Sequence, residues 1–119
     1  MIDPRELAES GLLLVDKPVA WTSHDVVNCV RRRFGVAKVG HCGTLDPIAT
    51  GLLVLVLGRA TRLAAQLTSQ DKVYAGTMRL GVETFTEDSA GEVTATADTA
   101  GIAAADVERV AQTFVGDIL

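Results

Sequence analysis

The chain has 119 residues, 48% hydrophobic and 22% charged, with a mean hydropathy of +0.28, which suits one domain with a buried core. This composition excludes a disordered, collagen-like or coiled-coil protein, and the longest apolar run, residues 52–57, is too short to span a membrane. Two cysteines make no disulfide framework and the N-terminus lacks a secretory pattern, so we expect a soluble cytoplasmic protein.

The charge is unevenly distributed along the chain, although the whole carries a net −4. Residues 11–82 carry nine bases against four acids, whereas residues 83–119 carry one base against eight acids. Phosphate binding depends on local positive potential rather than on the sum over the chain. The basic part therefore permits an RNA partner, but arginines that only keep a helix soluble explain the same count.

The first predicted elements are a strand and a helix. Residues 11–15 are an apolar run that predicts a buried strand. A helix is expected to begin at Thr22 or Ser23, because either hydroxyl can cap free backbone N–H groups. It places its apolar residues on one side up to Phe34, and Gly35 suits the position just past its end.

The next part of the chain predicts a short strand, an ordered loop and a central strand. Residues 38–41 are expected to form the short strand, and the Gly- and Pro-containing residues 42–51 the loop. Residues 52–57 have the length and apolar character of a strand in the middle of a sheet. We expect the whole chain, 1–119, to be a single continuous segment of mixed α and β structure.

The remaining elements follow the same reasoning from periodicity. Helical spacing predicts a helix over residues 60–67, and alternation predicts a strand over residues 72–80. A polar connection over 83–91 and a short strand over 93–96 come next. A last helical stripe consists of Val107, Val110, Ala111 and Phe114, and residues 115–119 resemble the entry into a new apolar strand.

The loop that contains Asp46 is the strongest candidate for a site. Asp46 precedes Pro47, which disfavours helical backbone at the aspartate, and Gly40, Gly43 and Gly51 allow close approach of another molecule. A carboxylate on such a loop between two strands is well placed to project into a cleft. An Asp-Pro turn that bonds its own backbone is the simpler alternative, and spacing alone does not decide between them.

Other constellations are weaker. A metal site could be assembled from His24, Cys29, His41 and Cys42, but these spacings match no common zinc pattern, and we expect no metal. Cys42 is expected to be a small loop filler rather than a nucleophile. Residues 40–43 fit the G-x-x-G clamp of KH RNA-binding domains, which is a very weak signal. Tyr74, an aromatic residue in a predicted strand, is by itself more typical of core packing.

Four ordered stretches resemble the TruB family of tRNA pseudouridine synthases. They are residues 11–18 with 21–27 (GLLLVDKP, WTSHDVV), residues 40–53 (GHCGTLDPIATGLL), residues 72–74 (KVY) and residues 80–88 (LGVETFTED). The resemblance implies an α+β fold like that of pseudouridine synthases, with a mixed, mainly antiparallel sheet and flanking helices. It also implies that the fold is incomplete at the C-terminus, where the rest of the catalytic domain and any RNA-binding domain would follow.

The resemblance also implies an activity and a set of site residues. The activity is isomerisation of uridine to pseudouridine in the T-loop of tRNA, at position 55, without a cofactor. Asp46 matches the essential carboxylate, which attacks the sugar, attacks C6 of the base or removes a sugar proton. Tyr74 would stack on the flipped base, His41 would hold the extruded nucleotides, and Gly43 and Thr44 would line the substrate site.

Further consequences concern partners and completeness. The T-arm of tRNA would be the partner, with Arg31, Arg32 and Lys38 near its phosphates, and a full-length member is expected to be a monomer. The arginine that pairs with the catalytic aspartate in this family would lie beyond Leu119. We therefore expect this chain alone to be inactive. A non-catalytic tRNA-binding or RNA-folding module is the alternative function, and a gene fragment without a role is a third.

Overall fold

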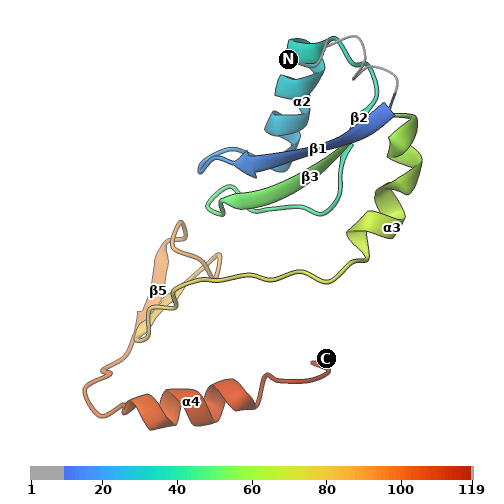
Figure 1. Cartoon of the computed structure of the whole chain (residues 1–119). Coiled ribbons are helices and arrows are strands. Elements are labelled where there is room, and N and C mark those ends of the chain that lie inside the picture. The colour runs from blue at the N-terminus through green and yellow to red at the C-terminus, as the bar shows by residue number, and fades with distance from the viewer. Residues whose placement is uncertain (1–9, 119) are drawn as a thin grey trace. The chain divides into compact units, whose positions relative to one another are not determined.

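Apolar runs and capping residues in the first 73 residues produce a small sheet with one helix packed on it. The computed structural model describes residues 10–118 and divides the chain into two compact units between Val73 and Tyr74. Figure 1 shows the helices and strands of both units. The mixed α and β composition with antiparallel pairing confirms the predicted fold class. The expectation that 1–119 is one segment of a larger catalytic domain stays a prediction.

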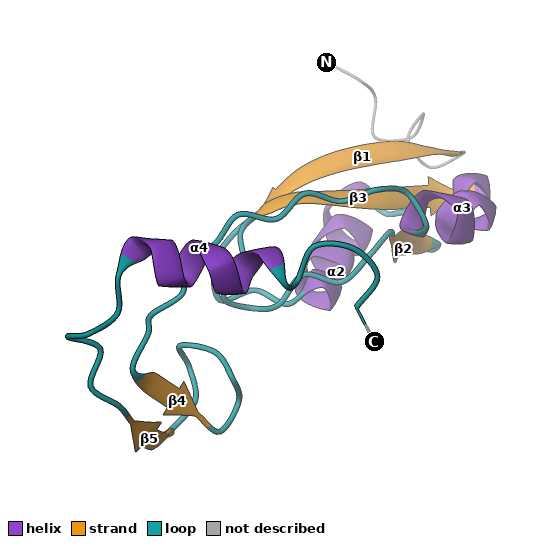
Figure 2. Ribbon diagram, turned by 90° about the horizontal axis from the view of Figure 1, so that it is seen from below, coloured by secondary structure: helices purple, strands orange, loops and turns teal. Residues whose placement is uncertain are grey.

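The sheet of the first unit has three antiparallel strands in the order β1-β3-β2. They are β1 (Ser10–Lys17), β3 (Gly51–Gly58) and β2 (Val39–His41), and Figure 2 shows β1 and β3 side by side. β1 pairs with β3 over its whole length. β3 is the central strand, as its apolar sequence predicted.

Helix α2 (Ser23–Phe34) begins and ends where the sequence predicted. The Thr22 hydroxyl accepts the Asp25 backbone N–H at 3.0 Å, and the Asp25 carboxylate accepts the Thr22 N–H at 2.8 Å, which forms a capping box. Gly35 ends the helix with a φ of 64°, in the left-handed region that glycine adopts without strain. Local signals are therefore sufficient to fix both ends of this helix.

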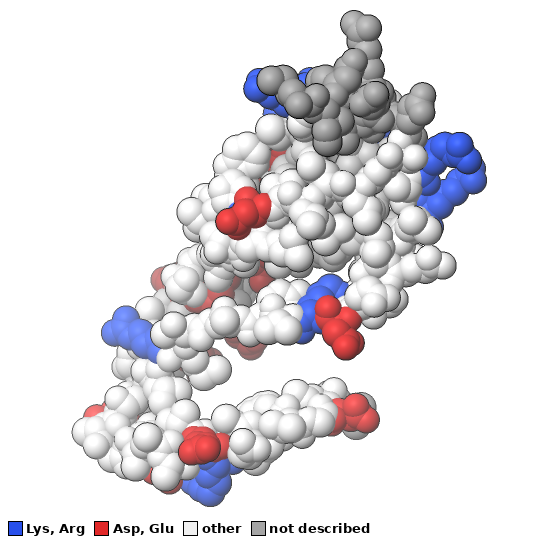
Figure 3. Space-filling model, in the orientation of Figure 1, with Lys and Arg blue, Asp and Glu red and all other residues white. Residues whose placement is uncertain are grey.

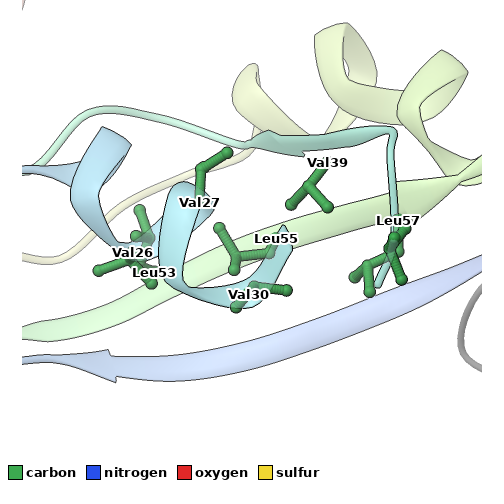
Figure 4. Close-up of a cluster of buried hydrophobic side chains, with 8 residues drawn as sticks. Val26, Val27, Val30, Val39, Leu53, Leu55 and Leu57 are labelled. Atoms are coloured by element: carbon green, nitrogen blue, oxygen red, sulfur yellow. The ribbon is translucent and has the colours of Figure 1, made fainter. Parts of the chain in front are cut away.

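The core of the first unit lies between α2 and one face of the sheet. Figure 4 shows valines of α2 against leucines of β3. Together with Val36, the buried cluster consists of Val26, Val27, Val30, Val39, Leu53, Leu55 and Leu57. Each of these side chains adds about 1.5–3 kcal/mol when it leaves water.

β1 confirms the strand predicted over residues 11–15, but only alternate residues of it are covered. Its side chains alternate, with Leu13 and Val15 packed against the core and Leu12 and Leu14 exposed to 50% and 65%. A strand exposes every second residue when a helix covers only one face of its sheet. The apolar run alone could not reveal that Leu12 and Leu14 are exposed.

The predicted helix over residues 60–67 is confirmed in two parts. A 3₁₀ turn, η1 (Arg59–Leu63), follows β3 directly and leads into the short helix α3 (Ala64–Thr68). A 3₁₀ turn is a common way to start or end a helix.

The predicted strand over residues 72–80, which begins in the last two residues of the first unit, is wrong. Within the described part of the chain this stretch pairs with no strand, and Val73 and Met78 are 97% and 83% exposed. Pairing begins only at β4 (Val82–Thr84), which lies antiparallel to β5 (Val93–Thr96). The predicted strand at 93–96 is confirmed, whereas the first two residues of the predicted connection, 83 and 84, belong to a strand. Alternation forms a strand only where a partner supplies the hydrogen bonds.

The last helix, α4 (Ala104–Gln112), is confirmed, but Phe114 of the predicted stripe lies beyond its end. Val107 and Val110 are 43% and 47% exposed. The predicted strand entry at 115–119 is wrong for residues 115–118, which form a bend followed by irregular chain, and Leu119 lies outside the described residues. Among the described residues, every helix is too short or too polar to cross a membrane.

Candidate active site

The candidate site is the loop of residues 42–50 that connects β2 to β3. The Cys42 N–H donates to the Val54 carbonyl at 2.8 Å, and the Ala49 N–H closes a turn onto the Asp46 carbonyl at 3.0 Å. Gly43 and Gly51 have φ values of 96° and 114°, which only glycine adopts readily. The loop is therefore an ordered turn joined to the sheet at both ends, as its Gly and Pro content predicted.

Asp46 presents an exposed carboxylate from this loop. The residues on either side of it are held by bonds to the first residue of α2 and to the connection that precedes this helix. Before it, the Leu45 N–H donates to the Ser23 hydroxyl at 2.9 Å. After it, the Pro47 carbonyl accepts the Ala20 N–H at 2.7 Å. An exposed side chain thus stands on a backbone that is fixed on both sides.

Lys17 supports the same loop from inside the protein, a role that sequence reasoning missed. Its side chain is fully buried, and its ammonium group donates to the carbonyls of Trp21 at 2.6 Å, Pro18 at 3.0 Å and Pro47 at 3.4 Å. A buried charge requires such partners. The sequence signals only that a lysine follows an apolar run, and nothing local indicates that it turns inward toward a loop 30 residues away.

His41 lies at the end of β2, half-buried, and contacts the start of the loop. Its Nδ1 lies 2.8 Å from the Gly43 carbonyl oxygen. A carbonyl oxygen only accepts hydrogen bonds, so Nδ1 carries the proton in this contact. The other ring nitrogen, Nε2, takes no part in it. A β-carbon at Gly43 would lie 3.2 Å from Cε of Lys72, so the backbone is closely approached here.

The structure brings together some of the predicted site residues and not others. His41, Gly43, Thr44 and Asp46 lie in or beside one loop of the first unit. Tyr74 is the first residue of the second unit, and its side chain is 67% exposed rather than packed in a core strand. Its place beside a substrate base stays a prediction.

The three residues predicted to contact phosphates differ in their exposure to solvent. Arg31 donates to the Val39 carbonyl at 3.1 Å, which joins α2 to β2, and its buried Nε has no hydrogen-bond partner within residues 10–118. Arg32 and Lys38 are exposed. On the face drawn in Figure 3 the lysine and arginine side chains form several separate groups. Of the three predicted phosphate contacts, Arg32 and Lys38 are therefore exposed, whereas Arg31 is half-buried.

Two further predictions, that Cys42 is a loop filler and that the chain holds no metal, concern the cysteine and histidine side chains. Burial raises the pKa of the Cys42 thiol, which keeps it protonated and fits the interpretation as a loop filler. Cys29 on α2 is also a free thiol. In the part of the chain that the structure describes, no group of three or more His, Cys, Asp or Glu side chains is placed to hold a metal ion.

Comparison with known proteins decides the family. Residues 31–119 match the family model described as TruB family pseudouridylate synthase, N-terminal domain. The chain belongs to the TruB family. The resemblance predicted from the four sequence stretches is therefore confirmed, and the match includes the whole Asp46 loop.

Curated relatives of this TruB family member extend the match to the first part of the chain. A protein of Opitutus terrae named tRNA pseudouridine synthase B is 47% identical over 117 residues, 98% of this chain and 48% of that protein. The proteins of the same name from Leifsonia xyli and Mycobacteroides abscessus are 54% and 48% identical over 87% and 99% of this chain. The chain spans about a third to a half of the length of these relatives.

Proposed function

We propose that this chain is the N-terminal part of the catalytic domain of a tRNA pseudouridine synthase. The protein would isomerise uridine at position 55 in the T-loop of tRNA and act in the cytoplasm as a monomer. The observation that carries the proposal is the identity of about 50%, over most of the chain, to proteins named tRNA pseudouridine synthase B. The exposed carboxylate of Asp46, on a loop that is fixed on both sides, supports the chemistry.

The proposed reaction is an isomerisation that needs no external reactant. The bond from C1′ of the ribose to N1 of uracil breaks, the base turns, and a bond from C1′ to C5 forms. The hydrogen on C5 leaves to solvent and N1 gains a proton, so atoms balance. Asp46 would attack the sugar, attack C6 of the base or remove a sugar proton. Each of these roles requires a positioned carboxylate, and the hydrogen bonds to Leu45 and Pro47 fix the backbone that carries it.

The other predicted residues would bind the substrate. The target uridine must leave the T-loop stack to reach Asp46, and an exposed phenol such as Tyr74 provides a face for stacking on the base. Nε2 of His41 would face the extruded nucleotides, since Nδ1 is held by the Gly43 carbonyl. Gly43 and Thr44 would line the site, and Arg32 and Lys38 would contact phosphates of the T-arm.

Tritium release from tRNA labelled at C5 of uridine tests the proposal, because the C5 hydrogen must leave. The assay uses a chimera in which this chain replaces the matching part of the Leifsonia xyli relative, and this chain alone is expected to be inactive. Asp46→Asn should abolish release, and Asp71→Asn, a change of an exposed carboxylate in the same unit, should not. Release that survives in the Asp46 variant would refute the proposal. tRNA binding without release in the unsubstituted chimera would favour a binding module.

A further inference from the structure

Ser23 makes contacts that its place at the start of a helix does not require. It is the first residue of α2 and is 2% exposed. The helix is capped by its neighbour Thr22, whose hydroxyl accepts the Asp25 N–H. The hydroxyl of Ser23 instead contacts a residue 22 positions away, where it accepts the Leu45 N–H at 2.9 Å and lies 3.3 Å from the Leu45 carbonyl oxygen, to which it donates.

These two contacts fix both polar groups of the residue that precedes Asp46. The Leu45 carbonyl belongs to the peptide bond that joins Leu45 to Asp46, so its direction sets the orientation of that peptide plane. The Leu45 N–H fixes the other side of the same residue. Leu45 also packs against the core cluster. The backbone leading into Asp46 is therefore held by one buried hydroxyl and by apolar packing.

We propose that Ser23 is a positioning residue for the carboxylate of Asp46, acting through the backbone of Leu45. The inference rests on the proposed function, in which Asp46 is the reacting group. A hydroxyl suits the task because it donates and accepts at once in a small buried space. The side chain of Asp46 is exposed, so its position relative to a bound nucleoside depends on the backbone that carries it. Small misplacements of a reacting group lower rates strongly.

Two neighbouring substitutions separate positioning from stability. Ser23→Ala removes both contacts to Leu45, whereas Thr22→Ala removes the helix cap and leaves Leu45 held. In the chimera described above, Ser23→Ala should lower kcat about 10- to 100-fold with little change in KM. Thr22→Ala should leave kcat within about twofold of the parent, because the Ser23 hydroxyl keeps both of its contacts to Leu45.

Amide hydrogen exchange in this chain provides a second readout that does not depend on activity. The Leu45 amide should exchange faster in Ser23→Ala than in the parent and remain protected in Thr22→Ala. Circular dichroism of both variants reports whether α2 still forms. An unchanged Leu45 amide in folded Ser23→Ala would show that Ser23 does not hold the loop and would overturn the inference.

The kinetic outcomes distinguish this inference from the proposed function. An equal loss of kcat in both variants would assign the effect to helix stability and overturn the positioning role, as would an unchanged kcat in Ser23→Ala. If Asp46→Asn released tritium at the parent rate, the proposed function would fail, and with it the need to position Asp46. If Asp46→Asn were inactive and Ser23→Ala fully active, only the inference about Ser23 would fail.

Discussion

Substitution of Lys17 by methionine tests whether the buried ammonium group holds the Asp46 loop in place. Methionine fills nearly the same volume, so packing is largely retained, but the three carbonyl contacts are lost. The Pro47 carbonyl keeps the Ala20 N–H at 2.7 Å, whereas the carbonyls of Pro18 and Trp21 lose the lysine donor. A hydrogen bond to a charged group contributes about 1.5–3 kcal/mol, and the burial of methionine in place of an ammonium group offsets part of the loss, so the free energy of unfolding should fall by about 2–4 kcal/mol.

Urea denaturation followed by fluorescence of Trp21 measures this loss, because Trp21 is the single tryptophan of the chain. With a slope of about 1 kcal/mol per molar urea, the midpoint should fall by about 2 M or more. Lys38→Met is the matched control, since Lys38 is exposed in the same unit, and its midpoint should change little. Equal midpoints for the two variants would refute the reasoning about the buried ammonium group.

Two further predictions concern α2 and the second unit. Hydrogen bonds from the Thr22 hydroxyl and backbone N–H hold the pKa of Asp25 below its ordinary value. The stabilisation of the folded state by this carboxylate is therefore complete above the ordinary pKa, and it is lost as the pH falls through the lower pKa of the folded state. Asp25→Asn should therefore lower the urea midpoint at neutral pH but not in strong acid, and an equal effect at both would contradict this. In Gly91→Ala the new β-carbon would meet the Thr86 hydroxyl and lie 2.9 Å from its backbone nitrogen, so amides of the β4–β5 turn should lose exchange protection. Gly101→Ala, with open space around it, should not change them.

The elements that the sequence predicted well are those that local chemistry determines. Thr22 and Gly35 mark the ends of α2 because capping involves only residues within one turn of the helix. The apolar residues 52–57 predicted β3 and its central place, and the strand order β1-β3-β2 confirms both. In these cases the information lies within a few residues of the element.

The predictions that are wrong concern strand pairing over residues 72–80 and 115–118. Both stretches have apolar residues with a suitable pattern, but pairing is a property of two segments, and the pattern describes only one. The same limit applies to β1, where Leu14 is 65% exposed. Alternation and apolarity say which residues can be buried, not which neighbour buries them.

In the candidate site too, the features that local sequence determines could be predicted, and those that depend on distant residues could not. The loop and its carboxylate are visible in the sequence because glycine and proline constrain the backbone locally, and Asp46 stands among them. The residues that support the loop are 22 and 30 positions away from their contacts, so no local pattern connects Ser23 to Leu45 or Lys17 to Pro47.

These supports explain how an exposed side chain can have a defined position. Lys17, Ala20 and Ser23 all belong to the short segment around the connection from β1 to α2, and all three contact the backbone on either side of Asp46. Ala20 has a φ of 68°, which is unfavourable for a residue with a β-carbon, yet in this conformation its N–H donates to the Pro47 carbonyl. The connection before α2 thus accepts local strain while it fixes the loop. Substitutions there should change the behaviour of Asp46 without touching its carboxylate.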